Sequence, residues 1–377
     1  MRIRSVVACA VCLTALLFGS ATSPAAGSAA VTRATSKLTY SARRVNVPSK
    51  TTAFPVALND AGQAIMGAQT CPDCAPTYYF WSAGAAIKIG QPAGVIAFQP
   101  YALGGSGVFA GYGQESGNPS TVESFIGRVA NQSVQFDRLL DPSGNPTGVI
   151  AFAMDAAGDI LGQNADDPSI YYLWPAGAPR AQTLQLPLAA DGPATITNLD
   201  SAGDFAGVVQ QPQGHEIAVW PGGQAPLILP GSLVSEDNAS GPVSISMAVS
   251  GDGSKVFVTA SQPLVDAHGH PKAEYWIVLR KTGQAQATAS QPFPIGTLSS
   301  SDGSSAASAI SPSGWVIGAS VGQSSRAFLY RPGKMTPIRK LITSGGKPNS
   351  SLFSQVPLAV NAKNQIVLGD WLLTPRG

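Results

Sequence analysis

The chain has 377 residues, of which 44% are hydrophobic and only 12% charged, with 23 Lys and Arg against 21 Asp and Glu. Such a balance gives no field that attracts a polyanion, and the one basic cluster is "RPGKMTPIRK" at 331–340. We therefore expect no nucleic-acid binding. No segment after residue 30 shows a sustained helical period, and Gly and Pro occur throughout, which excludes a mainly helical fold.

Residues 1–30 have the layout of a secretory signal peptide. Arg2 and Arg4 precede the apolar run "VVACAVCLTALLFG", and "GSATSPAAGSAA" supplies small residues for cleavage after Ala30. The apolar run is short for a membrane span, which needs about 20 residues. An uncleaved anchor is the alternative. We predict an extracellular or cell-surface protein that begins near Val31, has no membrane span and carries 21 basic against 21 acidic residues.

After a predicted strand at 36–47, one short hairpin recurs through the chain. "NDAGQAIMG" at 59–67 returns as "DAAGDILG", "DSAGDFAG", "SPSGWVIG" and "NAKNQIVLG". The equivalent turn position is occupied by glycine or asparagine in seven units, at Gly62, Gly107, Gly158, Gly203, Gly253, Gly314 and Asn364. Spacings of 45 to 61 residues are typical of propeller blades.

Each unit divides into four strands. In the third unit they are "AFAMD", "DILGQ", "IYYLWP" and "RAQTLQL". A short polar residue precedes the glycine of the first turn, where it can bond to the turn backbone. Many strands are apolar on both faces, as strands between neighbouring blades must be. The sequence therefore predicts an all-β fold, a seven-bladed β-propeller of four-stranded blades, as a single domain over residues 31–377.

These residues resemble the HAF-repeat family, extracellular repeat proteins named for a His-Ala-Phe signature. Its units read approximately Asn-x-x-Gly-x-Val-Val-Gly, then Ala-Phe-Leu-Trp, then Gly-x-Met-x-x-Leu, and the sixth unit, "AISPSGWVIGASVGQSSRAFLYRPGKMTPI", fits best. Arg326 stands in place of the signature His, Tyr330 replaces the Trp, and Val258 replaces the second glycine of the fifth unit. The resemblance covers residues 56–373. It implies export and a propeller-like fold, and it carries no catalytic residues.

The chain ends are complementary. The seventh unit has "PLAVN", "NQIVLGD" and "WLLTP" and then stops at Gly377 with three strands. Because a closed propeller must join its first and last blades, we expect residues 37–47 to form the outer strand of the seventh blade beside "WLLTP". Leu38, Tyr40 and Val45 would supply its apolar side chains. A disordered linker is the alternative.

Propeller geometry places the longer connections on one face. The loops joining strands two to three, and one blade to the next, share this face, and they include 68–77, 112–121, 230–243, 261–273 and 342–355. Binding residues concentrate on loops held by a rigid scaffold. The histidines and the cysteines of the mature chain are predicted to lie in the loops between strands two and three, at His215, His268, His270, Cys71 and Cys74.

The chemistry predicted for this face is limited. "DAHGH" brings Asp266, His268 and His270 within reach of one ion, but a fourth ligand is missing, so we interpret it as a solvated polar loop tip. His215 and these three residues are the candidate binding residues, and no metal, cofactor or catalytic residue is predicted. The Asp-Gly turns lack the ligand count of a calcium loop, and no G-x-S-x-G nucleophile motif occurs.

Cys71 and Cys74 are the only cysteines left after cleavage of the signal peptide. An oxidising compartment favours a disulfide that closes this loop. A redox Cys-x-x-Cys motif is the alternative, although no thioredoxin-like β-α context surrounds it.

Two classes of function remain open. The favoured hypothesis is a monomeric, non-enzymatic binding or scaffold protein that holds an extracellular glycan, peptide or envelope component on the long-loop face. The alternative is a secreted propeller enzyme, a lyase or hydrolase acting on a glycan at the central channel. Carboxylates brought together at the axis would favour the enzyme, and few acids occupy equivalent inner-strand positions.

Overall fold

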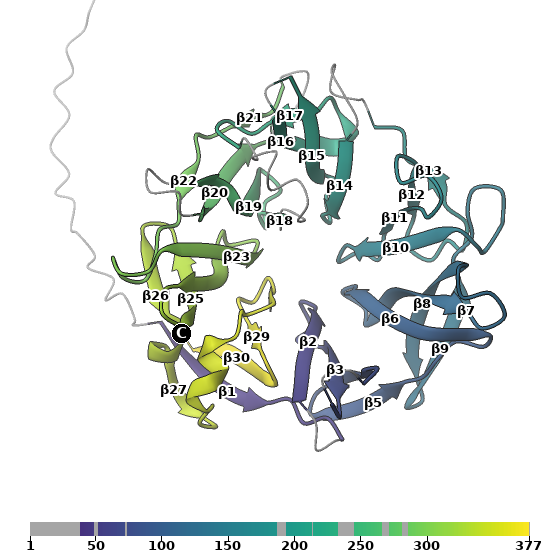
Figure 1. Ribbon diagram of the computed structural model, residues 1–377, viewed down its shortest axis with the longest axis horizontal. Helices are drawn as coiled ribbons and strands as arrows, with labels where there is room; N and C mark the ends of the chain where they lie inside the picture. The colour runs from purple at the N-terminus through teal and green to yellow at the C-terminus, as the bar shows by residue number, and fades with distance from the viewer. Residues whose placement is uncertain are drawn as a thin grey trace, which may run out of the picture. The chain divides into compact units, whose positions relative to one another are not determined.

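The computed structural model describes residues 38–48, 52–71, 74–186, 194–212, 214–232, 245–265, 271–280 and 286–376. These residues form seven β-sheets arranged in a ring, and in six of them the strand that comes first in the chain lies nearest the axis (Figure 1). The predicted all-β, seven-bladed propeller is confirmed. Among the residues that the structure describes, there is no apolar helix of membrane-spanning length.

Blades 1 to 3 each contain four antiparallel strands in chain order. Blade 1 consists of β2 (Thr52–Leu58), β3 (Ala64–Gln69), β4 (Thr77–Ser82) and β5 (Ala85–Ile89). Blade 2 consists of β6 (Val95–Leu103), β7 (Val108–Glu115), β8 (Val122–Ala130) and β9 (Ser133–Arg138). Blade 3 consists of β10 (Val149–Met154), β11 (Ile160–Asn164), β12 (Tyr171–Trp174) and β13 (Gln182–Thr183).

Blades 4 to 6 follow the same order. Blade 4 consists of β14 (Ala194–Leu199), β15 (Phe205–Gln211), β16 (Gly214–Trp220) and β17 (Leu227–Ile228). Blade 5 consists of β18 (Ile245–Val249), β19 (Lys255–Val265), β20 (Pro271–Leu279) and β21 (Thr288–Ala289), and a further strand, β22 (Phe293–Pro294), also pairs with β20. Blade 6 consists of β23 (Ser304–Ile310), β24 (Val316–Val321), β25 (Ser325–Arg331) and β26 (Lys334–Pro337).

Blade 7 combines the two ends of the described chain. Its inner strands are β28 (Ala359–Val360), β29 (Ile366–Leu368) and β30 (Trp371–Arg376), and β1 (Thr39–Arg44) pairs antiparallel with β30. The predicted closure by the N-terminal strand is therefore confirmed. One detail is wrong, because β1 is not the edge strand. The segment predicted as a plain blade link contributes a fifth strand, β27 (Ile342–Gly345), which pairs parallel to β1 on its outer side.

The closing strand is held by buried side chains. Tyr40 and Val45 are 0% and 1% exposed, and the Tyr40 hydroxyl donates a hydrogen bond to the carbonyl of Asn364 at 3.0 Å. Arg43 and Arg44 remain exposed. The strand therefore stays in place through the apolar residues that alternate with its polar ones.

The recurring hairpin is a turn that bonds to itself. In every blade the N–H of the turn residue donates to the carbonyl three residues earlier, as Gly203 does to Asp200 at 3.0 Å. The turn residue has positive φ throughout, from 56° at Asn364 to 100° at Gly158, which explains the preference for glycine and asparagine. The side chain at the start of the turn accepts further backbone N–H groups in most blades.

The second glycine of the repeat is required for a different reason. A Cβ at Gly207 or Gly318 would lie 2.1 Å from a carbonyl oxygen of the adjoining inner strand, because that strand contains a register shift. Blade 5 has no such shift between β18 and β19, and it is the blade in which Val258 replaces the glycine. The bulge in the first strand, rather than the turn, therefore requires this glycine.

The apolar core lies between neighbouring blades. One cluster joins Ala206 and Val219 of blade 4 to Met247 and Trp276 of blade 5. The third strands of four blades end in or contain a buried tryptophan, at Trp81, Trp174, Trp220 and Trp276. Burial on both faces of each sheet holds the blades at fixed places around the ring.

Candidate functional site

The antiparallel order of the strands gives the ring two unlike faces. The turns between strands one and two and between strands three and four lie on one face, the short-turn face. The loops between strands two and three, and the links between blades, lie on the opposite face, the long-loop face. The sequence placed the functional surface on the long-loop face.

The predicted histidine site is described only in part. His215 is the second residue of β16, paired with Gln210, so its predicted position in a loop is wrong. Its Nδ1 atom is buried without a hydrogen-bond partner. The candidate residues Asp266, His268 and His270 lie outside the described residues. In the part of the chain that the structure describes, no group of three His, Cys, Asp or Glu side chains is placed to hold a metal ion.

Two of the predicted long loops are shorter than expected. The strands β19 and β20 extend as far as Val265 and Pro271, well into the predicted loop at 261–273. Their pairing continues past a register shift, with Leu264 opposite Lys272. Likewise, β7 runs to Glu115 inside the predicted loop at 112–121.

The predicted disulfide is present. Cys71 and Cys74 are bonded within the connection between β3 and β4, on the long-loop face. The Gln69 side chain donates a hydrogen bond to the Cys74 carbonyl at 3.0 Å. The pair closes a loop of the scaffold.

A first hollow lies at the axis on the short-turn face. This cavity of about 220 Å³ is lined by the ends of the first strands and the starts of the first turns in all seven blades. Its carboxylates are those of Asp60, Asp155 and Asp200. A propeller enzyme acting at the central channel would use carboxylates in this position. Whether these three are free to react depends on the hydrogen bonds that they already accept.

Each of these carboxylates already accepts backbone hydrogen bonds. Asp155 Oδ1 accepts from Gly158 at 2.7 Å and Asp159 at 2.9 Å. Asp60 Oδ1 accepts from Ala362 of blade 7 at 2.7 Å. The acids at the axis are therefore engaged in holding turns and in joining blade 1 to blade 7.

Asp200 follows the same pattern in blade 4. Its Oδ1 accepts from Ala202 at 2.9 Å and from Asp204 at 3.1 Å. Burial, followed by the nearby charge of Asp204, raises the pKa of Asp200 to about 6. Asn59 and Asn361 make the equivalent turn contacts in blades 1 and 7, so the turn does not require a charge.

A larger hollow lies on the long-loop face at the junction of blades 6 and 7. This junction pocket has a volume of about 510 Å³. It is bordered by the start of β25, the end of β26 and two short 3-10 helices, η3 (Ile338–Lys340) and η4 (Ser350–Ser354). Its lining includes hydroxyl groups, apolar side chains and three cations, namely Ser324, Ser325, Ser350, Ser351, Ser354, Leu298, Ala327, Pro337, Phe353, Arg326, Arg339 and Lys340. No acidic residue lines it.

The sequence around η3 explains two of these cations. Ile338 and Leu341 are 0% and 7% exposed and anchor the short helix in the core of blades 6 and 7. Arg339 and Lys340 lie between these anchors and are exposed. Neither forms an ion pair or side-chain hydrogen bond with the described residues. The pocket therefore carries two positive charges that no described residue neutralises.

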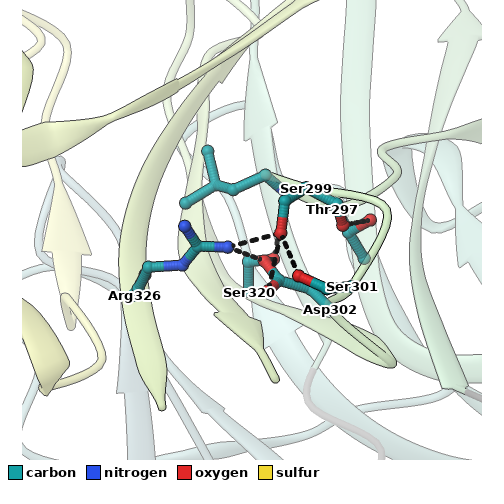
Figure 2. A network of polar contacts seen from close by, with 7 residues as sticks. Thr297, Ser299, Ser301, Asp302, Ser320 and Arg326 are labelled. Atoms are coloured by element: carbon teal, nitrogen blue, oxygen red, sulfur yellow. Dashed lines mark hydrogen bonds and ion pairs between the residues drawn. The ribbon is translucent and has the colours of Figure 1, made fainter. Parts of the chain in front are cut away.

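The third cation is fixed by a polar network. Figure 2 shows Arg326 reaching from β25 toward the loop that carries Ser299 and Asp302. Its Nη2 donates to Ser299 at 2.8 Å and also to the Asp302 carboxylate, which accepts a further bond from Ser320 at 2.6 Å. Although burial acts to raise the pKa of Asp302, the bonds from Ser320, Arg326 and Ser299 outweigh it and lower that pKa. The pair therefore stays charged, with the Arg326 side chain 42% exposed.

The sequence pattern does not predict that these three cations lie in one pocket. Arg326 was singled out only because it replaces the signature histidine. The basic cluster at 331–340 divides between the two ends of β26. Arg331 stacks on Trp315 at 5.6 Å and Lys334 begins the strand, whereas Arg339 and Lys340 follow its far end at the pocket. Two cations placed between buried Ile338 and Leu341 were the signal that could have identified the site.

The comparisons with known proteins give only distant structural similarities. No protein-family model and no curated protein matches the chain. Among solved structures, it is similar to YCF48 bound to D1 peptide (13% identity, 89% of this chain and 96% of that chain, TM-score 0.48). It is also similar to an oligogalacturonate lyase in complex with manganese (10%, 90% and 96%, TM-score 0.48) and to AofleA from Arthrobotrys oligospora (12%, 82% and 91%, TM-score 0.41). These similar structures differ from one another in what their names describe, and they assign no family to this chain.

Proposed function

We propose that the chain is an exported, non-enzymatic binding protein, and that it binds an anionic ligand in the junction pocket. One observation supports this most directly. The junction pocket on the long-loop face, with a volume of about 510 Å³, is lined by three cations, five serines and no acid. Its volume falls within the roughly 300–1,000 Å³ that is usual for small-molecule sites.

The bonding of the cations fits this role. Arg326 is pre-oriented by Asp302 and Ser299, so its guanidinium presents donors in a fixed plane. Arg339 and Lys340 are exposed and have no partner among the described residues. A carboxylate or a comparable anion would complete the charge pairing, and the serines would bond to its neighbouring polar groups.

The experiment compares charge removal on the two faces. Binding of labelled alginate and of neutral dextran is measured for the wild type and for the Arg339→Ala/Lys340→Ala double variant. The Lys334→Ala/Lys363→Ala double variant removes equal charge from the short-turn face. We expect alginate but not dextran to bind, and we expect the first variant alone to weaken binding by about tenfold, the effect of roughly 1.4 kcal/mol. Equal weakening by both variants would contradict a specific pocket.

The enzyme hypothesis remains the alternative because carboxylates do line the axial cavity. Their turn hydrogen bonds weigh against it. Incubation with alginate, followed by assay of new reducing ends, separates the two. We expect no product. Product that disappears in Asp155→Asn and Asp200→Asn variants would replace the binding proposal with a catalytic one.

A further inference from the structure

A second hollow, at the outer edge of blade 7, shares two lining residues with the junction pocket. This rim pocket, of about 270 Å³, is lined by Arg339, Ile342–Pro348 and Phe353. Arg339 and Phe353 line both pockets. The two hollows therefore adjoin across one cation and one aromatic ring.

The rim pocket is formed by closely packed backbone. Its wall includes β27, the strand at the outer side of β1 (Figure 1). Gly346 donates its N–H to the Ala42 carbonyl at 2.9 Å, and a Cβ at position 346 would lie 2.3 Å from the Trp371 ring. The missing side chain thus allows the segment to lie flat against blade 7. This leaves Lys347 exposed beside the hollow.

The short helix η4, between the two pockets, is also held firmly. The Asn349 side chain accepts the N–H of Leu352 at 3.1 Å at the start of η4, and Leu352 is buried at 4% exposure. Phe353 follows directly, half-buried against the same core. Its ring is therefore fixed at the boundary between the two pockets.

The charges and hydroxyls are spread over both pockets. Arg326 and Lys340 lie in the junction pocket, Arg339 lines both pockets, and Lys347 lines the rim pocket. No acidic residue lines either pocket. The Ser344 hydroxyl of the rim pocket has no hydrogen-bond partner within the described part of the chain. Separated cations, hydroxyls and the half-buried Phe353 ring match an oligosaccharide whose sugar rings each carry one carboxylate.

Building on the proposed function, we infer that the two pockets form one groove whose ligand is an acidic oligosaccharide, with one uronate carboxylate in each pocket. Arg326 and Lys340 hold the first carboxylate, Lys347 holds the second, and the Phe353 ring packs against the sugar between them. A phosphate chain would carry its charges more densely and would gain nothing from the ring. Joining two sites in one ligand makes the second contact intramolecular and raises the affinity.

Calorimetry on the full chain with mannuronate from monomer to tetramer tests this inference, with mannose oligomers of equal length as neutral controls. We expect the trimer to bind at least about tenfold more tightly than the monomer, and we expect mannose oligomers not to bind. Lys347→Ala should remove the gain in affinity with oligomer length, so that the trimer binds this variant no more tightly than the monomer does. Phe353→Leu, which keeps an apolar side chain against the core, should weaken binding of the trimer more than it weakens binding of tripolyphosphate.

The other outcomes separate this inference from the function on which it rests. A monomer that binds as tightly as the trimer, or a length gain that survives Lys347→Ala, overturns the two-pocket groove. If monomer binding then still falls with Lys340→Ala, the junction pocket keeps its proposed function. Tripolyphosphate binding that depends on Lys340 in the absence of mannuronate binding overturns the carbohydrate. Failure of every anion to bind overturns both proposals.

Discussion

On the short-turn face, the polar side chain at the start of each first turn is bonded to its own turn in most blades. At the junction of blades 6 and 7 on the long-loop face, Arg339 and Lys340 have no partner among the described residues. Both faces are polar, yet one uses its polar groups to hold the chain and the other leaves them open. The axial carboxylates each accept backbone hydrogen bonds, although the buried Oδ2 of Asp200 has no partner among the described residues. The comparison teaches that charge near a propeller axis is by itself weak grounds for a site.

The largest effect should come from opening the ring on which both faces depend. A chain that begins at Thr51 lacks β1 and so exposes the apolar surface that Tyr40 and Val45 bury at 0% and 1% exposure. We expect it to be unfolded or to melt about 10 °C or more below the full chain, since each large buried side chain contributes roughly 2–5 kcal/mol.

Differential scanning calorimetry measures this loss. The Tyr40→Phe variant, which loses only the hydrogen bond to Asn364, should cost about 1 kcal/mol and keeps the test interpretable. A shortened chain with the same melting temperature as the full chain would show that β1 does not close the ring.

The next effect concerns the second glycine. Gly318→Ala places a methyl group 2.1 Å from the Ala306 carbonyl, so the inner strand must shift. We expect a loss of about 3 kcal/mol in the free energy of unfolding. Gly117→Ala has nothing within 4 Å of the added atom and should change stability by less than about 0.5 kcal/mol in the same urea titration. Equal costs would mean that the bulge does not require the glycine.

Asp200→Asn sharpens the comparison at the axis. Because the folded pKa of about 6 lies above the unfolded value near 3.9, the folded state holds the proton more tightly. Wild-type stability therefore falls as pH rises from about 4 to 6. The variant keeps the Oδ1 acceptor and avoids this fall, so we expect it to match the wild type near pH 4 and to exceed it by about 2 kcal/mol above pH 7.

Thermal melts across this pH range check the prediction. A variant less stable than the wild type at pH 7 would show that the Asp200 charge is needed, and the axial carboxylates would then deserve a functional interpretation.

The smallest effect is expected on the long-loop face. Cys71→Ala/Cys74→Ala opens a loop with a sequence separation of only 3, so the loss should be about 1–2 kcal/mol. Thermal melts of the variant and of the reduced wild type should agree. A loss of stability as large as that of Gly318→Ala would indicate that the long-loop face, where we propose binding, also contributes strongly to stability.

The sequence predicted the fold more successfully than the site. Gly203 and its equivalents mark turns because a positive φ and a short preceding side chain are local requirements, readable from a few neighbouring residues. The same reasoning placed His215 in a loop, although β16 begins before it. A strand ends where its hydrogen-bonded pairing stops, and residue type does not mark that point. The pairing of Val265 with Pro271 therefore shortens the loop predicted at 261–273.

The sequence by itself determined the number of blades, the self-bonded turns, the disulfide loop and the closing strand, because each follows from local patterning or from a count of strands. The tertiary structure alone decided which polar groups remain open. Arg326 meets Asp302 and Ser299 only across neighbouring elements, and Arg339 meets Phe353 at a pocket only because η3 and η4 fold side by side between blades 6 and 7. Whether a charged side chain is satisfied depends on what approaches it in space, and that is set by packing over long separations in the chain.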